Sequence, residues 1–320
     1  MPLPGWGSAD SPFHPGEQAA QEHVGMRERM DQVGRRIVRD FMPDQHREFF
    51  EDLPFLVVGS ARPEGTLWAS LLFGEPGFVS SPTERGLLIR AAPLPGDPLG
   101  ENLRVGAPLG LLGIELPTRR RNRANGRVSS RSSDSFEVQV EQSFGNCNQY
   151  IQARAGIFRR PAAPTHEAAA LSAAALSLLS RTDTTFIATS SQAPQRGFSE
   201  GVDVSHRGGR PGFVRTVTEA STTRLTMPDF SGNFMFNTFG NLEVNPRAGL
   251  LALDFDSGAL LSLTGTASVQ WEGPEVDAFE GAERLLRFEV SEGLLWADVL
   301  QGWSAPQFSP HLRGTGVWTG

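Results

Sequence analysis

The stretch NLRVGAPLGLLGIE at residues 102–115 recurs as NLEVNPRAGLLALD at residues 241–254. The first Asn-Leu, the following Val and the run Gly-Leu-Leu are identical at a constant offset of 139 residues, and this offset continues to Gly126 and Gly265. Self-similarity at one fixed spacing is the sequence signature of a repeated structural unit. The chain therefore predicts a fold built from two copies of one module.

Two earlier matches extend the repeat toward the N-terminus. The tetrapeptide PGFV occurs at residues 76–79 and 211–214, an offset of 135. PFLVVGS aligns with TFIATSS so that Phe55 matches Phe186, an offset of 131. The three blocks keep their order, and two insertions of four residues account for the changing offset. The copies then span about 48–150 and about 177–300.

Each copy is expected to be rich in β-strands, because short apolar runs such as GLLIRAA and GLLGIEL are bounded by Gly, Pro and Ser. One helical segment is expected within each copy. The clearest helical patterns lie outside the copies, in PGEQAAQEHVGMRERMDQVGRRIVRDFM and in the alanine-rich THEAAALSAAALSLLSR. We predict a helical arm at 1–47, a first repeat at 48–152, a linker helix at 153–180 and a second repeat at 181–320. The predicted fold class is mainly β, and periodicity alone leaves both a barrel and a sandwich open.

Composition limits the chemistry. Apolar residues at 39% and charged residues at 20% are typical of a globular protein. No apolar run approaches the roughly 18 residues of a membrane span, and the N-terminal residues lack a signal-peptide pattern, so we expect a cytoplasmic protein without a membrane partner. The net charge of −7 disfavours nucleic acid as a partner. One cysteine, Cys147, and scattered histidines argue against a metal site.

A candidate anion site lies in the second copy. All 29 basic residues are arginines, so guanidinium and backbone N–H groups must hold any small anion. The segment SHRGGR combines a hydroxyl, two guanidiniums and a predicted glycine turn, which suit a phosphate. Its residues are Ser205, His206, Arg207, Gly208, Gly209 and Arg210. The matching segment SLLFGE at 70–75 is apolar and ends in an acid, so only the second copy is expected to bind phosphate; a simple polar turn is the alternative.

Asparagines follow this segment at helical spacing. Asn233, Asn237 and Asn241 recur every four residues, so on a helix they would share one face. An asparagine at a helix start caps exposed N–H groups, and such a terminus favours a nearby anion. Capping without a ligand is the alternative.

A row of arginines marks the first copy. In strand register, Arg119, Arg121, Arg123 and Arg127 project to one face together with Asn125. Like charges in such a row need partners. One candidate is the next strand, where Glu137, Gln139 and Glu141 share a face, and we favour this internal ladder. The other candidate is the cofactor of the second copy.

The segments GVDVSHRGGRPGFV and LTMPDFSGNFMFNTFGNLEVNPRAGLLALDF resemble the pyridoxamine 5'-phosphate oxidase-like family of split β-barrels. The family's Pro-Asp-x-x-Gly-Asn segment matches residues 228–233, which adds Asp229 to the candidates. FHPGE near the start and QSFGNCNQYIQAR resemble the branch with two barrels in one chain. His206-Arg207 departs from the usual Pro-Lys, and Asn148 from the usual proline.

The resemblance implies tandem FMN-binding split β-barrels, each of six strands, with one flavin phosphate held by the second copy. FMN is the expected cofactor, with FAD, a deazaflavin or haem as alternatives. The expected function is flavin-dependent oxidation or reduction of an unknown small molecule, with NAD(P)H as a potential reductant. A non-catalytic flavin or haem binding protein and a deazaflavin-dependent reductase stay open. The resemblance also leaves open a homodimer.

Overall fold

The computed structural model describes residues 4–191 and 199–318. Two large antiparallel sheets dominate it, in the orders β2-β1-β5-β6-β7-β4-β3 and β11-β10-β14-β15-β16-β13-β12. The first sheet contains β1 (Phe55–Ala61), β2 (Leu67–Phe73), β3 (Val79–Thr83), β4 (Gly86–Ile89), β5 (Pro108–Glu115), β6 (Arg120–Arg131) and β7 (Phe136–Gly145). The second contains β10 (Thr184–Ser190), β11 (Val202–Gly208), β12 (Arg215–Glu219), β13 (Thr222–Phe230), β14 (Arg247–Asp254), β15 (Ala259–Gln270) and β16 (Ala282–Trp296).

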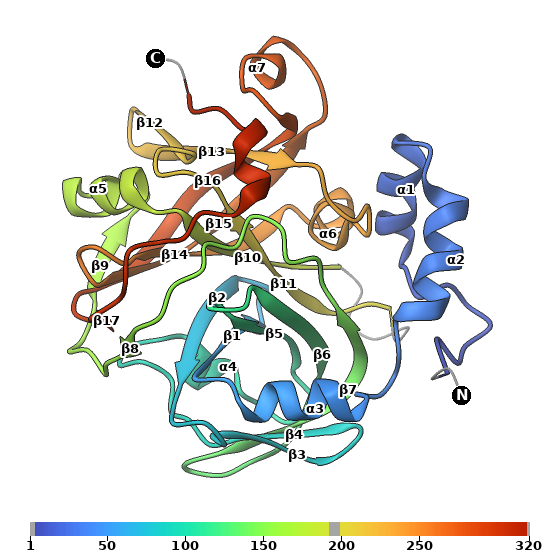
Figure 1. The fold of residues 1–320 in the computed structure, drawn as a ribbon. Coiled ribbons are helices and arrows are strands. Elements are labelled where there is room, and N and C mark those ends of the chain that lie inside the picture. The colour runs from blue at the N-terminus through green and yellow to red at the C-terminus, as the bar shows by residue number, and fades with distance from the viewer. Residues whose placement is uncertain (1–3, 192–198, 319–320) are drawn as a thin grey trace.

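The two strand orders are the same once each strand is exchanged for its repeat partner. Each hydrogen-bonded path has seven strands rather than the expected six. A hairpin forms one end of each path, β3–β4 in the first and β12–β13 in the second. Figure 1 shows the first sheet curving around its own centre. The hydrogen-bonded path ends at β2 and β3, so the described strands form an open barrel. The fold is mainly β, with two split barrels in tandem and flanking helices.

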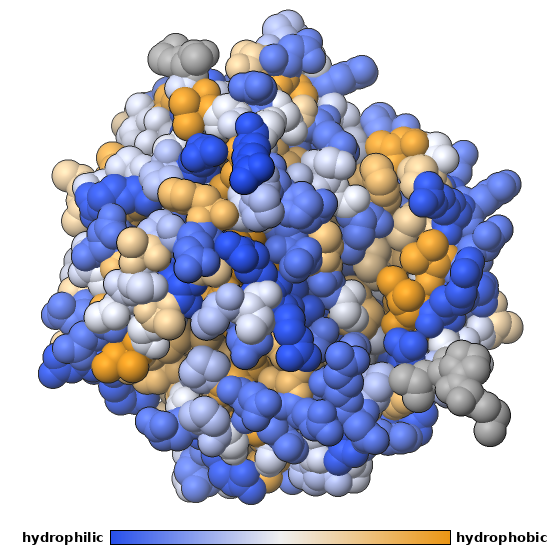
Figure 2. All heavy atoms as spheres, viewed as in Figure 1, coloured by the Kyte–Doolittle hydropathy of each residue, from blue (hydrophilic) through white to orange (hydrophobic). Residues whose placement is uncertain are grey.

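Helices cover the barrels and join them. They are α1 (Pro15–His23), α2 (Arg27–Ile37), α3 (Asp44–Glu51), α4 (Leu99–Asn102), α5 (Ala173–Arg181), α6 (Asn237–Val244), α7 (Pro274–Asp277) and the 3₁₀ helix η1 (Pro310–Gly314). α4 and α6 occupy equivalent places, each directly before β5 or β14. In Figure 1, α1 lies beside α6. Figure 2 shows a mostly hydrophilic face, with an apolar area over α1 and α2.

The predicted linker helix at 153–180 is shorter in the structure, where only α5 is helical. Residues 165–168 instead form β9 (Thr165–Ala168), which pairs with β16. β8 (Ile157–Phe158) pairs with β17 (Leu300–Gln301). Alanine-rich composition favours helix only weakly, and pairing with an available strand overrides that preference.

The repeated Gly-Leu-Leu run has a structural reason at the interface between the barrels. A Cβ on Gly110 would lie 2.8 Å from the Cα atom of Asp203, and one on Gly249 would lie 2.7 Å from that of Trp68. Gly110 and Gly249 are related by the offset of 139, and Trp68 and Asp203 by the offset of 135. The same close backbone approach therefore occurs twice, related by a pseudo-twofold axis.

Candidate functional site

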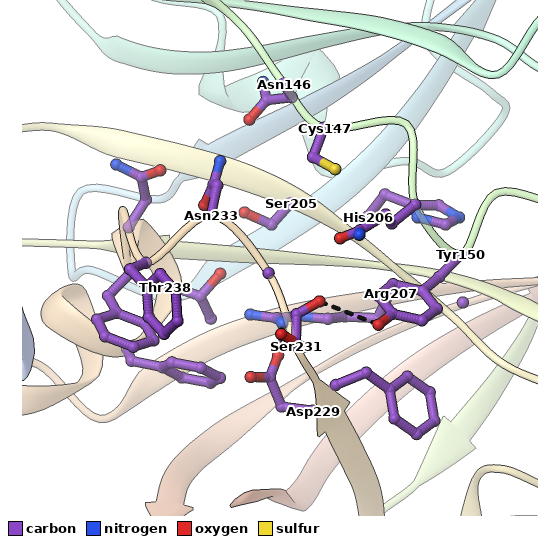
Figure 3. A pocket seen from close by; sticks show the side chains of 18 of the residues that line it. Asn146, Cys147, Tyr150, Ser205, His206, Arg207, Asp229, Ser231, Asn233 and Thr238 are labelled. Atoms are coloured by element: carbon purple, nitrogen blue, oxygen red, sulfur yellow. Dashed lines mark hydrogen bonds and ion pairs between the residues drawn. The ribbon is translucent and has the colours of Figure 1, made fainter. Parts of the chain in front are cut away.

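One cavity of about 120 Å³ lies where the two barrels meet (Figure 3). The first barrel contributes Arg121 and Arg123 from β6 and Asn146, Cys147, Gln149 and Tyr150 from the segment after β7. The second contributes residues 205–208 of β11, residues 228–234, the start of α6 and Arg284 of β16. The side chains labelled in Figure 3 come from both barrels and converge on this cavity.

Seven of the nine predicted site residues line this cavity. They are Ser205, His206, Arg207, Gly208, Asp229, Asn233 and Asn237. Gly209 and Arg210 do not line it. Gly209 donates its N–H to the carbonyl of Asp183, and the Arg210 guanidinium lies over the Phe308 ring, 5.6 Å from its centroid. Arg210 therefore points toward the C-terminal segment and away from the cavity.

The glycine turn predicted for SHRGGR is wrong for most of its length. Residues 205–208 belong to strand β11 and pair in register with β10, from Ile187–Ser205 to Thr184–Gly208. A strand directs alternate side chains to opposite faces, so it does not form a concave nest of successive N–H groups. The segment contributes side chains to the cavity instead.

The three asparagines do not share one helical face. α6 begins at Asn237, so Asn233 lies in the preceding loop, where its Oδ1 accepts the Met235 N–H at 3.2 Å. Asn237 lines the cavity, whereas Asn241 points to the N-terminal arm and bonds His14. Loop residues 231–234 bring Asn233 to the cavity, which the regular spacing does not reveal.

Most of the arginines at the cavity already have carboxylate partners. Arg207 and Arg284 both bind Asp229, the latter with an Nη1–Oδ2 distance of 2.9 Å. Arg123 binds Asp203 with an Nη1–Oδ2 distance of 2.8 Å. Arg284 also binds Glu283, so the three carboxylates Asp203, Asp229 and Glu283 balance these three guanidiniums.

Arg121 is the exception. Within the described chain, no carboxylate lies within ion-pair distance of its guanidinium, and its Nε donates only to the Cys147 carbonyl. Burial, together with the neighbouring Arg123 and Arg207, lowers the pKa of Arg121 to about 9. The side chain is still a cation at neutral pH, so the cavity presents one uncompensated positive charge.

Several polar atoms of the cavity wall have no hydrogen-bond partner among residues 4–191 and 199–318. They include Nε2 of His206, Oγ1 of Thr238 and Nδ2 of Asn146, and also the Nε atoms of Arg123, Arg207 and Arg284. Burial, and the charges of Arg121 and Arg207, lower the pKa of His206 far below its usual value, so its imidazole is neutral. Buried polar atoms normally find partners, and those that lack one in a cavity point to a ligand or to water.

Aromatic rings border the same cavity. Tyr150 donates its hydroxyl to the Ser231 carbonyl at 3.0 Å, and its ring lies 5.0 Å from that of Phe230. Phe236 and Phe239 line the wall near α6. The cavity therefore combines flat apolar surfaces with one cation and neutral polar groups.

Of the ion pairs predicted between the arginine row and the acidic residues of β7, the described chain forms one. Arg127 binds Glu141 with an Nε–Oε1 distance of 3.1 Å, whereas Glu137 pairs in register with Ser130. Arg119 donates to the carbonyls of Ile151 and Gln307. Bulges in β6 between Asn125 and Gly126 and between Val128 and Ser130 shift the register, so the spacing of charges in sequence does not match across the strands.

The pseudo-twofold axis relates the cavity to an equivalent position on the other side of the interface. Apolar side chains fill that position. The repeat offsets pair Arg121 with Leu260 and His206 with Leu71. The Asn146 backbone N–H donates to the Arg121 carbonyl, and Trp296 pairs in register with Leu260. Asn146 and Trp296 are therefore at equivalent positions. Leu71, Leu260 and Trp296 belong to one core cluster between the barrels and are at most 1% exposed. Only one of the two equivalent sites is therefore open and polar.

No family model and no curated protein matches the chain. Solved structures match about two fifths of it. HupZ of Group A Streptococcus is 14% identical, with a TM-score of 0.29 over 39% of this chain and 94% of HupZ. A Lactobacillus delbrueckii protein provisionally assigned as a pyridoxamine 5'-phosphate oxidase is 13% identical, with a TM-score of 0.30 over 42% of this chain and 100% of that one. HutZ, the haem storage protein of Vibrio cholerae, is 14% identical, with a TM-score of 0.24 over 43% of this chain and 96% of HutZ.

The described residues lack both a membrane-spanning helix and a cluster of metal ligands. None of their helices is both long and apolar enough to cross a membrane. They contain no group of three or more His, Cys, Asp or Glu side chains that could hold a metal ion.

Proposed function

We propose that the cavity between the barrels binds one flavin of the FMN type per chain, and that the protein is a flavin-dependent oxidoreductase acting on a small molecule. The observation that carries this proposal is Arg121, a partly buried cation that lines the cavity with no carboxylate partner among the described residues. Taking a cation out of water costs free energy, and a bound anion offsets that cost. A ligand phosphate is such an anion.

The remaining wall suits the rest of a flavin. His206, Thr238 and Asn146 offer polar atoms that need partners, and a flavin ring system has several polar edge atoms. Tyr150, together with the phenylalanines near α6, offers apolar surface for a flat ring. The bound cofactor would supply the electron transfer, while the chain's residues bind it, orient it and keep water away.

The residue proposed to bind the phosphate is therefore Arg121 and not Arg207. Arg207 binds Asp229, and Arg284, which shares that carboxylate, also binds Glu283, so the charge of Arg207 is compensated inside the protein. The Ser205 hydroxyl accepts from Arg123 Nη2 at 2.7 Å and is also engaged. The cation for the phosphate then comes from the first barrel, whereas most of the wall comes from the second.

His206 favours haem as a second candidate. A neutral imidazole with a free Nε2 is the form of histidine that coordinates iron. If haem binds, His206 would be the residue able to ligate its iron, and Arg121 would be the residue able to pair with an acidic substituent. The two candidates differ in the role of His206, which is a hydrogen-bond partner for a flavin and a metal ligand for haem.

Titration of the cofactor-free protein with FMN, followed by flavin fluorescence, tests the proposal. We expect one site per chain and, in Arg121→Leu, roughly 10- to 150-fold weaker binding, since a hydrogen bond to a charged group contributes about 1.5–3 kcal/mol. Arg210→Leu is the matched control, because Arg210 points away from the cavity, and it should bind FMN as the natural chain does. Two flavins per chain, or equal affinity in both variants, would contradict the proposal.

The visible spectrum of protein incubated with haemin tests the alternative. A haem spectrum that is lost in His206→Leu, combined with no FMN binding, would favour haem. Reduction of the bound flavin by NADPH or NADH then separates an oxidoreductase from a carrier.

A further inference from the structure

The N-terminal motif FHPGE docks α1 directly onto α6. A Cβ on Gly16 would lie 2.1 Å from the Gly240 carbonyl oxygen, and one on Gly240 would lie 2.4 Å from the Cα atom of Glu17. The two helix backbones therefore touch through a pair of glycines. This contact brings buried polar side chains of the arm to the helix that begins at the cavity.

Two side-chain pairs connect the helices. Nδ1 of His14 accepts the Gly16 N–H at 3.1 Å, so Nε2 carries the ring proton and donates to Oδ1 of Asn241 at 2.9 Å. Glu17 Oε1 accepts from Nδ2 of Asn237, and Glu17 Oε2 accepts the His14 backbone N–H at 2.9 Å. Both oxygens of Glu17 are thus committed to N–H donors, and the side chain is only 5% exposed.

Asn237 carries this connection into the cavity. Its Oδ1 accepts from Nη1 of Arg123 at 2.8 Å, and the residue lines the cavity. Arg123 in turn bonds Asp203, the Val204 carbonyl and Ser205. Glu17 and the rest of α1 do not line the cavity. The hydrogen bonds run from Glu17 through Asn237 to Arg123.

We propose that Glu17 is a positioning residue for the cavity: its carboxyl fixes the orientation of the Asn237 amide, which in turn holds Arg123 and the first turn of α6 in place. An amide held between an acceptor and a donor has one orientation only, because the flipped amide would face donor to donor. The N-terminal arm is then part of the binding site although it does not touch the ligand. The ligand half of this inference rests on the proposed flavin function.

A charge-exchange experiment tests the proposal. In Glu17→Gln, the new amide can accept from His14 but meets the Asn237 donor with a donor. Asn237→Asp places two carboxyls against each other. In the double variant Glu17→Gln/Asn237→Asp, each donor again meets an acceptor: the new Gln amide N–H donates to the new Asp carboxylate, which also accepts from Arg123. The carboxyl group then lies on the cavity side. Glu22→Gln is the control, because Glu22 is exposed on the same helix.

Amide hydrogen exchange at residues 237–240 is the readout without ligand. We expect roughly tenfold faster exchange in Glu17→Gln, the factor that corresponds to 1.4 kcal/mol for a lost buried hydrogen bond. Recovery in the double variant to within about threefold of the natural chain would support the proposal. Exchange equal to that of Glu22→Gln, or a double variant no better than the worse single one, would overturn it. If Glu17→Gln does not fold, recovery of folded protein in the double variant decides the question.

FMN affinity gives the ligand readout. Glu17→Gln should bind FMN about tenfold more weakly, whereas Glu22→Gln should bind as the natural chain does. If the natural chain binds no FMN, the proposed function fails, while hydrogen exchange still decides whether Glu17 positions α6. If the natural chain binds FMN and Glu17→Gln binds it equally well, the flavin proposal stands and the role of Glu17 at the site is overturned.

Discussion

Arg123 of the first barrel and Asp203 of the second form an ion pair across the interface, with an Nη1–Oδ2 distance of 2.8 Å. Their side chains are only 3% and 8% exposed. The pseudo-twofold axis relates Arg123 to Ser262 and Asp203 to Trp68, so the pair occurs on one side only. On the other side, the Ser262 hydroxyl bonds the Ala69 carbonyl, where Arg123 bonds that of Val204. Of these two related positions in the described chain, the one beside the open cavity holds a buried ion pair and the other an uncharged hydrogen bond.

This asymmetry predicts a large effect of breaking the pair. Arg123→Leu leaves the Asp203 carboxylate buried with only Asn125 and Ser205 as side-chain partners, and should destabilise the protein by about 3–5 kcal/mol. Arg123→Leu/Asp203→Leu removes both charges and should recover most of this loss. Urea unfolding measures both variants. A loss below about 1 kcal/mol in the single variant would mean that the pair is solvated.

Arg121 should favour binding at the expense of stability. Its partly buried charge has no carboxylate partner in the described chain, and Leu260 fills the equivalent position in the second barrel. Arg121→Leu should therefore raise the melting temperature of the ligand-free protein and reduce the additional increase that FMN produces. Thermal unfolding with and without FMN measures both effects. A lower melting temperature without FMN would show that Arg121 contributes to stability.

Glu17 should make stability depend on pH. Burial raises the pKa of its carboxyl from 4.5 to about 8, with Asp203 adding to the rise and Arg123 opposing it. Between these two values the folded chain holds a proton that the unfolded chain releases. The contribution of Glu17 is therefore fully present below about pH 4.5 and is lost as the pH rises to about 8.

The comparison with Glu17→Gln isolates this effect from the other titrating groups. The difference in unfolding free energy, natural chain minus variant, should fall steadily from pH 5 to pH 8 and level off above that. Urea unfolding at four pH values in this range gives the curve. A difference independent of pH would assign Glu17 its usual pKa.

The contact between α1 and α6 should be sensitive to a single methyl group. Gly240→Ala would place a Cβ 2.4 Å from the Cα atom of Glu17, so the arm must move or the helix must shift. We expect faster amide exchange in α1 and weaker FMN binding. Gly100→Ala in α4 is the control, because no atom lies within 4 Å of its Cβ and the residue does not line the cavity. Equal exchange in both variants would show that the glycine contact is not required.

Repeat offsets predict the duplicated fold because both barrels need the same residues at the same places. Gly110 and Gly249 allow the same backbone approach, and Gly126 and Gly265 both occupy bulges where a Cβ would meet a carbonyl oxygen of the next strand. Such constraints act on backbone geometry and leave an imprint at fixed spacing. Six strands were predicted for each barrel, and each hydrogen-bonded path has seven.

Much of the candidate site could be predicted as well, since the second copy has polar residues where the first has apolar ones. His206 and Arg207 stand out in this way against Leu71 and Leu72. The charge balance could not be predicted. Asp229 lies 22 residues from Arg207 and 55 from Arg284. The pairing of β13 with β16 places Asp229 opposite Arg284, whereas Arg207 comes from β11, a strand that does not pair with β13.

The sequence by itself determined that the chain is a duplicated β-protein and that the second copy differs from the first at one polar segment, because these are properties of residue type and spacing. Only the tertiary structure decided which guanidinium is free. Arg121, Arg123 and Arg207 are alike in sequence, but their electrostatic state depends on the carboxylates within a few ångströms, and those come from other strands and from the other barrel. For the same reason, FHPGE looks like a helix cap in sequence, while its position beside α6 connects it to the cavity.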